Sequence, residues 1–116
     1  MRIAFASDEN KGLESNIAFH FGRCKYYVFV DVEDKEIKKI EVKENPFFNQ
    51  HQPGIIPQFI AKEKANVIIA GGMGPRAVDW FKKLGIRPIT GVKGKVKDVL
   101  NDFLEGKSFN VKTCKE

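Results

Sequence analysis

A histidine and a cysteine four positions apart are the residues of this 116-residue chain best suited to bind a metal. They are His20 and Cys24, with Arg23 directly before the cysteine. Imidazole and thiolate are ligands that soft transition metals and iron–sulfur clusters accept. We expect Arg23 to lower the pKa of the Cys24 thiol and to offset the charge of an anionic cluster. A lone pair at this spacing is not a closed metal site, and His51, in a later loop, is a looser third candidate.

A glycine-rich turn over residues 71–76 is the second feature that could bind a ligand. Glycines at the start of a helix present unpaired backbone N–H groups, and the helix dipole there favours anions. The same glycines would also serve a tight turn that binds nothing. The turn is neither a Walker loop nor the dinucleotide-binding pattern. Met73 within it is either a soft contact or a packing residue.

Short apolar runs and helical spacings indicate the elements that must position these residues. Strands are expected where apolar or β-branched residues run together, and helices where apolar residues recur three or four positions apart. Pro75 suits the first position of a helix, and Gly85 suits its end. The predicted strands cover 2–7, 26–32, 37–42, 67–70 and 86–90, and the predicted helices 56–64, 75–84 and 96–104.

The order of these elements predicts a three-layer α/β fold with a mixed five-stranded sheet and helices on both faces. Alternation of strand and helix in the second half requires a parallel core, to which an antiparallel hairpin is added on one side. Ligands of such sheets bind beyond the carboxyl ends of the parallel strands. We therefore expect the loops 7–23, 71–76 and 90–95 to line one cleft.

Length and composition limit the class of protein. The length fits one domain, residues 1–106, followed by a short polar tail at 107–116. There is no apolar run long enough to span a bilayer and no secretory pattern, so we expect a cytoplasmic protein with no membrane partner and with Cys24 and Cys114 as free thiols. The net charge of +5 either attracts anions or forms a solvated face, and the abundance of Lys and Glu is typical of thermophiles.

Five segments of the chain stand in a characteristic order and spacing. They are Ser7-Asp8, His20-Phe21-Gly22-Arg23-Cys24, Gly71-Gly72-Met73-Gly74-Pro75-Arg76-Ala77, Gly85-Ile86 and Thr90-Gly91. Taken together they resemble the dinitrogenase iron-molybdenum cofactor biosynthesis family. The resemblance runs from Arg2 to about Gly106, and it implies a ribonuclease H-like topology. It also implies binding and delivery of iron–sulfur or iron–molybdenum cluster precursors.

The resemblance implies a ligand set of His20 and Cys24, with His51 as a looser member. Because the chain has no Cys-x3-Cys-x2-Cys set, we expect it to carry or transfer a cluster, not to build one or act as an enzyme. Cluster donor or acceptor proteins are then its expected partners, with no specific nucleic acid, and the chain is expected to be a monomer or weak homodimer. The residues expected to surround the cluster are Ser7, Arg23, Gly72, Met73, Gly74 and Arg76.

Three other functions fit parts of the sequence. A regulatory module could bind an anion or small molecule on the glycine turn without metal. A nuclease would need carboxylates gathered around metal ions, for which Asp8, Glu9 and Asp31 are the candidates. A catalytic thiol would need His20 to activate Cys24, but no third orienting group is evident.

Overall fold

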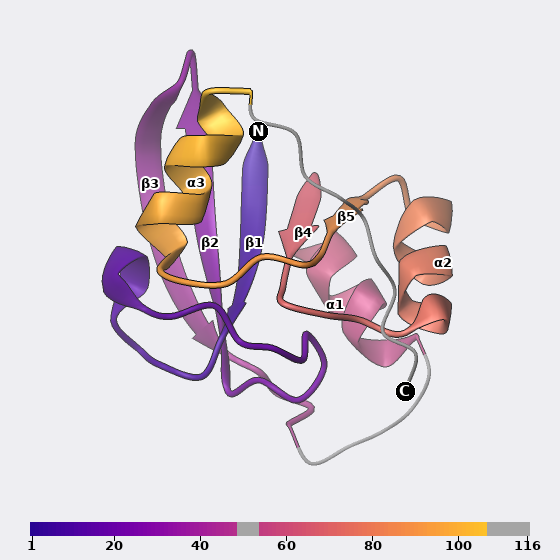
Figure 1. The fold of residues 1–116 in the computed structure, drawn as a ribbon. Coiled ribbons are helices and arrows are strands. Elements are labelled where there is room, and N and C mark those ends of the chain that lie inside the picture. The colour runs from indigo at the N-terminus through magenta and orange to yellow at the C-terminus, as the bar shows by residue number, and fades with distance from the viewer. Residues whose placement is uncertain (49–53, 107–116) are drawn as a thin grey trace.

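The computed structural model describes residues 1–48 and 54–106, which form a mixed sheet flanked by helices (Figure 1). No helix in these two ranges combines the length and apolar character that crossing a membrane requires. The elements are β1 (Arg2–Ser7), the 3-10 helix η1 (Gly12–Glu14), β2 (Tyr26–Glu33), β3 (Glu36–Glu44), α1 (Ile55–Lys62), β4 (Val67–Ile69), α2 (Pro75–Lys83), β5 (Arg87–Ile89) and α3 (Val96–Leu104).

The strand order is β3-β2-β1-β4-β5. β1 pairs antiparallel with β2, and β2 pairs antiparallel with β3. On the other side, β1 and β4 are parallel, as are β4 and β5. The predicted mixed five-stranded sheet, with a parallel part and a hairpin added on one side, is therefore confirmed.

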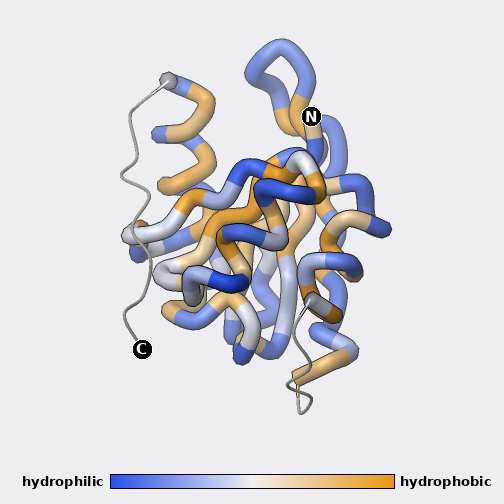
Figure 2. The backbone as a smooth tube through the Cα atoms, turned by 90° about the vertical axis from the view of Figure 1, so that its right-hand side faces the viewer, coloured by the Kyte–Doolittle hydropathy of each residue, from blue (hydrophilic) through white to orange (hydrophobic). Residues whose placement is uncertain are grey.

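Helices cover both faces of the sheet because neighbouring strand residues point to opposite sides. On β1, Ala4 and Ala6 belong to the core that packs under α1 and α2, whereas Ile3 and Phe5 belong to the core that packs under α3. Figure 1 shows α3 across the near face of the sheet and α1 on the far side. In Figure 2 the hydrophobic stretches gather in the interior and the hydrophilic ones at the outer turns. The three-layer α/β architecture is confirmed.

The element ends follow local backbone chemistry. Pro75 opens α2, and Gly85 follows its last turn with a φ of +76°, as the sequence predicts. The β2–β3 hairpin turns through Asp34 and Lys35, both with positive φ, which is the twist that two-residue hairpins favour. Helix α1 ends two residues earlier than predicted, because Lys64 has a φ of +64° and cannot continue a right-handed helix.

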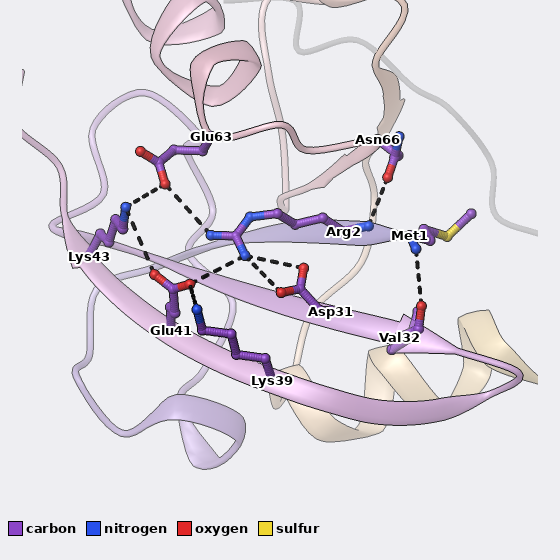
Figure 3. A network of polar contacts seen from close by, with 9 residues as sticks. All are labelled: Met1, Arg2, Asp31, Val32, Lys39, Glu41, Lys43, Glu63 and Asn66. Atoms are coloured by element: carbon purple, nitrogen blue, oxygen red, sulfur yellow. Dashed lines mark hydrogen bonds and ion pairs between the residues drawn. The ribbon is translucent and has the colours of Figure 1, made fainter.

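A network of charged side chains holds the amino end of β1 (Figure 3). The Arg2 guanidinium donates to both carboxylate oxygens of Asp31, at 3.0 and 3.1 Å. It also lies 3.5 Å from a carboxylate oxygen of Glu41 and 3.6 Å from one of Glu63. Its charged end stacks 4.7 Å from the centre of the Phe29 ring. One arginine therefore joins β1, β2, β3 and the end of α1.

Candidate functional site at the carboxyl ends of the strands

Three loops meet at the carboxyl ends of β1, β4 and β5, as the sequence predicts. The Ile17 N–H donates to the Gly94 carbonyl at 2.8 Å, and the Gly91 N–H donates to the Gly71 carbonyl at 2.9 Å. The Phe21 N–H donates to a carbonyl of the glycine turn, that of Gly72, at 3.2 Å. Backbone hydrogen bonds therefore join the three loops into a continuous rim at this end of the sheet, and a cleft between the loops stays a prediction.

The segment before Cys24 is fixed against the glycine turn as a short added strand. His20 and Gly72 form an isolated parallel bridge. The Gly71 N–H donates to the Ala18 carbonyl at 2.9 Å, and the Gly72 N–H donates to the Phe19 carbonyl at 2.5 Å. These two turn donors are therefore not free for an anion, which favours, for Gly71 and Gly72, the alternative in which the glycines serve a tight turn.

Gly71 is required by this close approach. A Cβ atom at position 71 would lie 2.8 Å from the Cα of Phe19, which real Cβ contacts do not tolerate. A Cβ at Gly74 would meet no atom within 4 Å, and Gly74 has the extended conformation of a helix N-cap. The first glycine thus serves packing between loops, while Gly74 leaves open space at the start of α2.

His20 and two arginines are the exposed candidates at this rim. The His20 side chain is half-buried, and its ring meets the Phe19 ring edge-on, with 4.7 Å between the ring centres. Arg23 and Arg76 are exposed, and neither forms an ion pair with any residue in 1–48 or 54–106. The rim therefore offers one imidazole and two positive charges that no carboxylate of the described chain neutralises.

Cys24, by contrast, is buried, with 1% of its surface exposed. Its thiol donates to the Phe21 carbonyl at 3.2 Å, and the Tyr27 hydroxyl donates to the same carbonyl. Burial raises the pKa of the Cys24 thiol to about 12. The expectation that Arg23 lowers this pKa is wrong, because Arg23 is solvent-exposed and the loss of solvent around the sulfur dominates.

Ser7 and Met73 lie inside the protein. The Ser7 hydroxyl donates to the Asn16 carbonyl at 2.8 Å and accepts from the Glu9 N–H at 3.1 Å. Met73 is 2% exposed and packs in the core shared by α1 and α2. Ser7 thus shapes the first loop and Met73 anchors the glycine turn, while a direct contact of either with a ligand stays a prediction.

Asn45 positions Cys24, although it is not among the residues that the sequence predicts for the site. Its buried side-chain amide donates to the Cys24 carbonyl at 2.9 Å and accepts from the Phe47 N–H at 2.9 Å. The Asn45-Pro46 pair, typical of a turn, was the available signal. His51 and Cys114 lie outside the described residues. In the described part of the chain, no three His, Cys, Asp or Glu side chains are grouped so as to hold a metal ion.

The nuclease hypothesis requires carboxylates that the structure places apart. Asp8 follows the carboxyl end of β1, where one of its oxygens accepts from the Lys25 N–H at 3.3 Å. Asp31 lies at the opposite end of the sheet, in register with Arg2 and paired with it. Glu9 is bound by Asn16 and Lys11. These three acids do not converge, so we discard the nuclease hypothesis.

The fold and the rim define a small α/β domain whose candidate ligand site lies beyond the parallel strands. The chain belongs to the family described as dinitrogenase iron-molybdenum cofactor, which it matches over residues 1–106. It is 36% identical to an uncharacterized protein of Methanocaldococcus jannaschii over 109 residues, which is 92% of this chain and 88% of the relative.

Two solved structures resemble the whole domain. The crystal structure of PH0822 is 39% identical, with a TM-score of 0.85 over 97% of this chain and 96% of that chain. The apo form of the orange protein from Desulfovibrio gigas is 28% identical, with a TM-score of 0.81 over 98% of this chain and 92% of that chain. Both similarities extend over the sheet and over the loops that form the rim.

Proposed function

We propose that this protein binds and carries an anionic metallocluster of the iron–sulfur or iron–molybdenum type, or a precursor of one, at the rim formed by its loops. One observation carries the proposal. The pairing of His20 with Gly72 joins the segment that carries a half-buried histidine to the glycine turn, while Arg23 and Arg76 from the same two segments keep charges that are unpaired within residues 1–48 and 54–106. Membership of a family described by the iron-molybdenum cofactor supports the choice of cargo.

The cargo would be held mainly by charge. Arg23 and Arg76 would neutralise it, and the first turn of α2 adds the positive end of a helix dipole with backbone N–H groups that lack helical acceptors. His20 would supply a nitrogen ligand. A closed site for a single ion is not supported by the described residues, which lack a group of three ligands. A larger anion bound by several weak contacts suits this rim better.

Cys24 would join the ligand set only after a change in its loop. The neutral thiol has to lose its proton and its hydrogen bond to the Phe21 carbonyl before sulfur can bind metal. The turn over residues 21–24 would have to move for this. We therefore expect His20 and the arginines to govern the first binding step, with Cys24 acting later.

Anaerobic reconstitution with ferrous iron and sulfide, and separately with tetrathiomolybdate, tests the proposal. The parent protein is expected to retain metal after gel filtration and to show charge-transfer absorption. His20→Ala and Arg76→Ala should each lower the retained metal severalfold, whereas Lys82→Ala, which removes an exposed cation from the far end of α2, should not. Equal retention by all four proteins, or none by the parent, would refute cargo binding at this rim.

A metal-free role is the second candidate, because the buried neutral thiol makes Cys24 unsuited to ligation in this conformation. The rim would then bind an anion or small molecule and regulate a partner. Thermal stabilisation by phosphate or nucleotides, with no metal retained in the reconstitution experiment, would favour this role over carriage of a cluster.

We further infer a ribonuclease H-like topology, for which the strand order β3-β2-β1-β4-β5 is the support. We also propose that the protein is cytoplasmic, that it comes from a thermophile, and that it is a monomer or a weak dimer. Its proposed role is not enzymatic, and its proposed partners are proteins that give or accept the cargo.

A further inference from the structure

Phe19 is the most exposed aromatic side chain of the described residues, with 60% of its surface accessible. Its backbone is nevertheless fixed. The Phe19 carbonyl accepts from Gly72, its Cα lies against Gly71, and the neighbouring Ala18 N–H donates to Ala6 of β1 at 2.7 Å. The one ring contact recorded for Phe19 in this part of the chain is the edge-on contact with His20. A large apolar ring is thus held in solvent by a rigid backbone.

An exposed ring on a rigid backbone is well prepared for binding. Burying a phenylalanine ring in a partner removes apolar surface from water, and here little backbone entropy would be lost on association. The other strongly exposed apolar side chains differ from Phe19 in their location in the fold. Ile37 and Ile40 lie in β3, away from the rim, and Leu84 follows the last turn of α2. Met1 is the first residue, and Phe48, which is 39% exposed, follows β3. Of these six side chains, Phe19 alone comes from the segment that is hydrogen-bonded to the glycine turn.

Three exposed cations come from the two segments that meet at Phe19. Arg23 and Lys25 lie four and six residues further along the chain, and Arg76 is the second residue of α2, the helix that follows the glycine turn bonded to Phe19. These three side chains are exposed and form no ion pair within residues 1–48 and 54–106. By contrast, Lys95 and Lys97 near η1 are both paired with Glu14. The segment that carries Phe19 and the helix after the glycine turn therefore supply cations that are unpaired among the described residues.

An aromatic anchor with arginines around it is typical of the residues that dominate protein interfaces. Its complement is an apolar recess bordered by Asp and Glu. Sites for single-stranded nucleic acid use several aromatic platforms in succession along a groove, whereas Phe19 and Phe48 are the two strongly exposed aromatic rings among the described residues. A protein partner with an acidic border is thus the better match to the observed surface.

We infer that Phe19, Arg23, Lys25 and Arg76 form a docking surface for an acidic face of the protein that gives or takes the cargo. This inference rests on the proposed function, because it assigns the exchange partner of the same rim. Phe19 inserts into an apolar recess of the partner, and the three cations pair with surrounding carboxylates. Docking at this surface would place the partner next to His20, where the cargo is proposed to bind, so that the cargo can pass directly from one protein to the other.

Photo-crosslinking of the full chain tests this surface. p-Benzoylphenylalanine replaces Phe19, and the metal-free protein is irradiated in an extract of its own host cells. The crosslinked peptides are then sequenced by mass spectrometry. The expected peptides contain apolar residues flanked by several Asp or Glu. The same photoreactive residue at Ile40, which is 41% exposed on β3, is the matched control and should not capture these peptides.

A charge variant tests the role of the cations. Lys25→Glu should lower the yield of the position-19 crosslink about fivefold or more, because a repulsive charge at an interface slows association. Lys38→Glu, which changes an exposed lysine of the hairpin, should leave the yield unchanged. Capture of nucleic acid, of another copy of this chain, or of peptides without an acidic excess would overturn the inference, and so would equal yields from the two charge variants.

Cargo binding is measured separately in Phe19→Ala. This variant should retain as much metal as the parent after reconstitution, while losing the partner in a pull-down with the protein identified by crosslinking. If the parent retains no metal but the crosslink and its charge dependence persist, the proposed cargo is wrong and the docking surface stands. If metal is retained and the crosslink fails, the docking surface is wrong and cargo binding stands.

Discussion

Cys24 is held in its neutral form by its surroundings. The side chain is buried, its S–H donates to the Phe21 carbonyl, and the Asn45 amide holds its own carbonyl in place. A thiolate, the form that binds metals, would lose solvent without gaining a positive partner. At the scale of single residues, the two members of the predicted ligand pair therefore differ: His20 is accessible, and Cys24 acts first as a structural residue.

This difference predicts a loss of stability at alkaline pH. The ordinary pKa of 9.0 for Cys24 rises to about 12 in the folded protein. Between these values the unfolded chain has released the thiol proton while the folded chain keeps it, so the free energy of unfolding falls as pH rises above 9.0. Below 9.0 both states hold the proton, and the thiol contributes no pH dependence.

Urea unfolding at pH 8 and pH 10 measures this effect. In a Cys114→Ser background, which removes the second thiol, Cys24→Ala should lose less stability between the two pH values than its parent does. Burial raises the pKa of the Tyr27 hydroxyl well above its ordinary value in the folded protein, and because both proteins keep Tyr27, its contribution is largely cancelled in the comparison. The same alkaline loss in both proteins would mean that the Cys24 thiol titrates normally.

At the scale of elements, the rim is built by backbone pairing between loops. The Ala18–Phe21 stretch adds to the sheet next to Gly71 and Gly72, in the same direction as the parallel strands. Side-chain periodicity cannot predict such pairing, because backbone hydrogen bonds leave no pattern in the sequence. The glycines are the one sequence signal of this pairing between loops, and they are equally consistent with a free turn that binds an anion.

Substitution of Gly71 should therefore be costly. The added Cβ of Gly71→Ala would push Phe19 and its loop away, and we expect a loss of about 1–3 kcal/mol in the free energy of unfolding. Hydrogen exchange of the Phe21 N–H, which donates to Gly72, should become faster because the added strand is displaced.

Gly74→Ala is the matched control in the same turn. Its φ of −70° suits alanine and its Cβ meets open space, so the change in stability should stay within about 1 kcal/mol. Exchange of the Phe21 N–H should not change in this variant. Equal effects of the two alanines would show that the close contact of Gly71 with Phe19 is not what restricts position 71.

The elements themselves were largely predictable from the sequence. Apolar runs located the strands, and Pro75 and Gly85 marked the two ends of α2 because each residue has a restricted backbone role. The site was predictable to the level of which loops meet, since that follows from strand direction. Burial of Cys24 was not predictable, because it depends on Tyr27 and Asn45, which come from other elements.

At the scale of the whole molecule, the two ends of the sheet use charge differently. At the carboxyl ends, Arg23 and Arg76 remain without carboxylate partners among the described residues. At the amino end, Arg2 contacts three acids that come from β2, β3 and the end of α1 (Figure 3). The first arrangement suits binding of an anion, and the second suits stability of the domain.

Arg2→Ala should therefore reduce stability without affecting the rim. The Arg2 side chain is 14% exposed, and its removal leaves Asp31, Glu41 and Glu63 close together without their shared cation. Loss of one partner from a buried pair costs about 3–5 kcal/mol, but these acids are partly exposed, so we expect about 2 kcal/mol in the free energy of unfolding. Removal of the stacking on Phe29 adds to the loss.

Lys38→Ala supplies the comparison for this experiment. Its pair with Glu36 has side-chain exposures of 53% and 73%, so the effect on urea unfolding should be below about 0.5 kcal/mol. Both variants should retain metal like the parent after reconstitution, because neither residue lies at the carboxyl ends of the strands. An Arg2→Ala protein as stable as Lys38→Ala would mean that the network in Figure 3 is a surface arrangement with little energetic weight. A stable Arg2→Ala protein that loses metal would instead place part of the binding function at the amino end of β1.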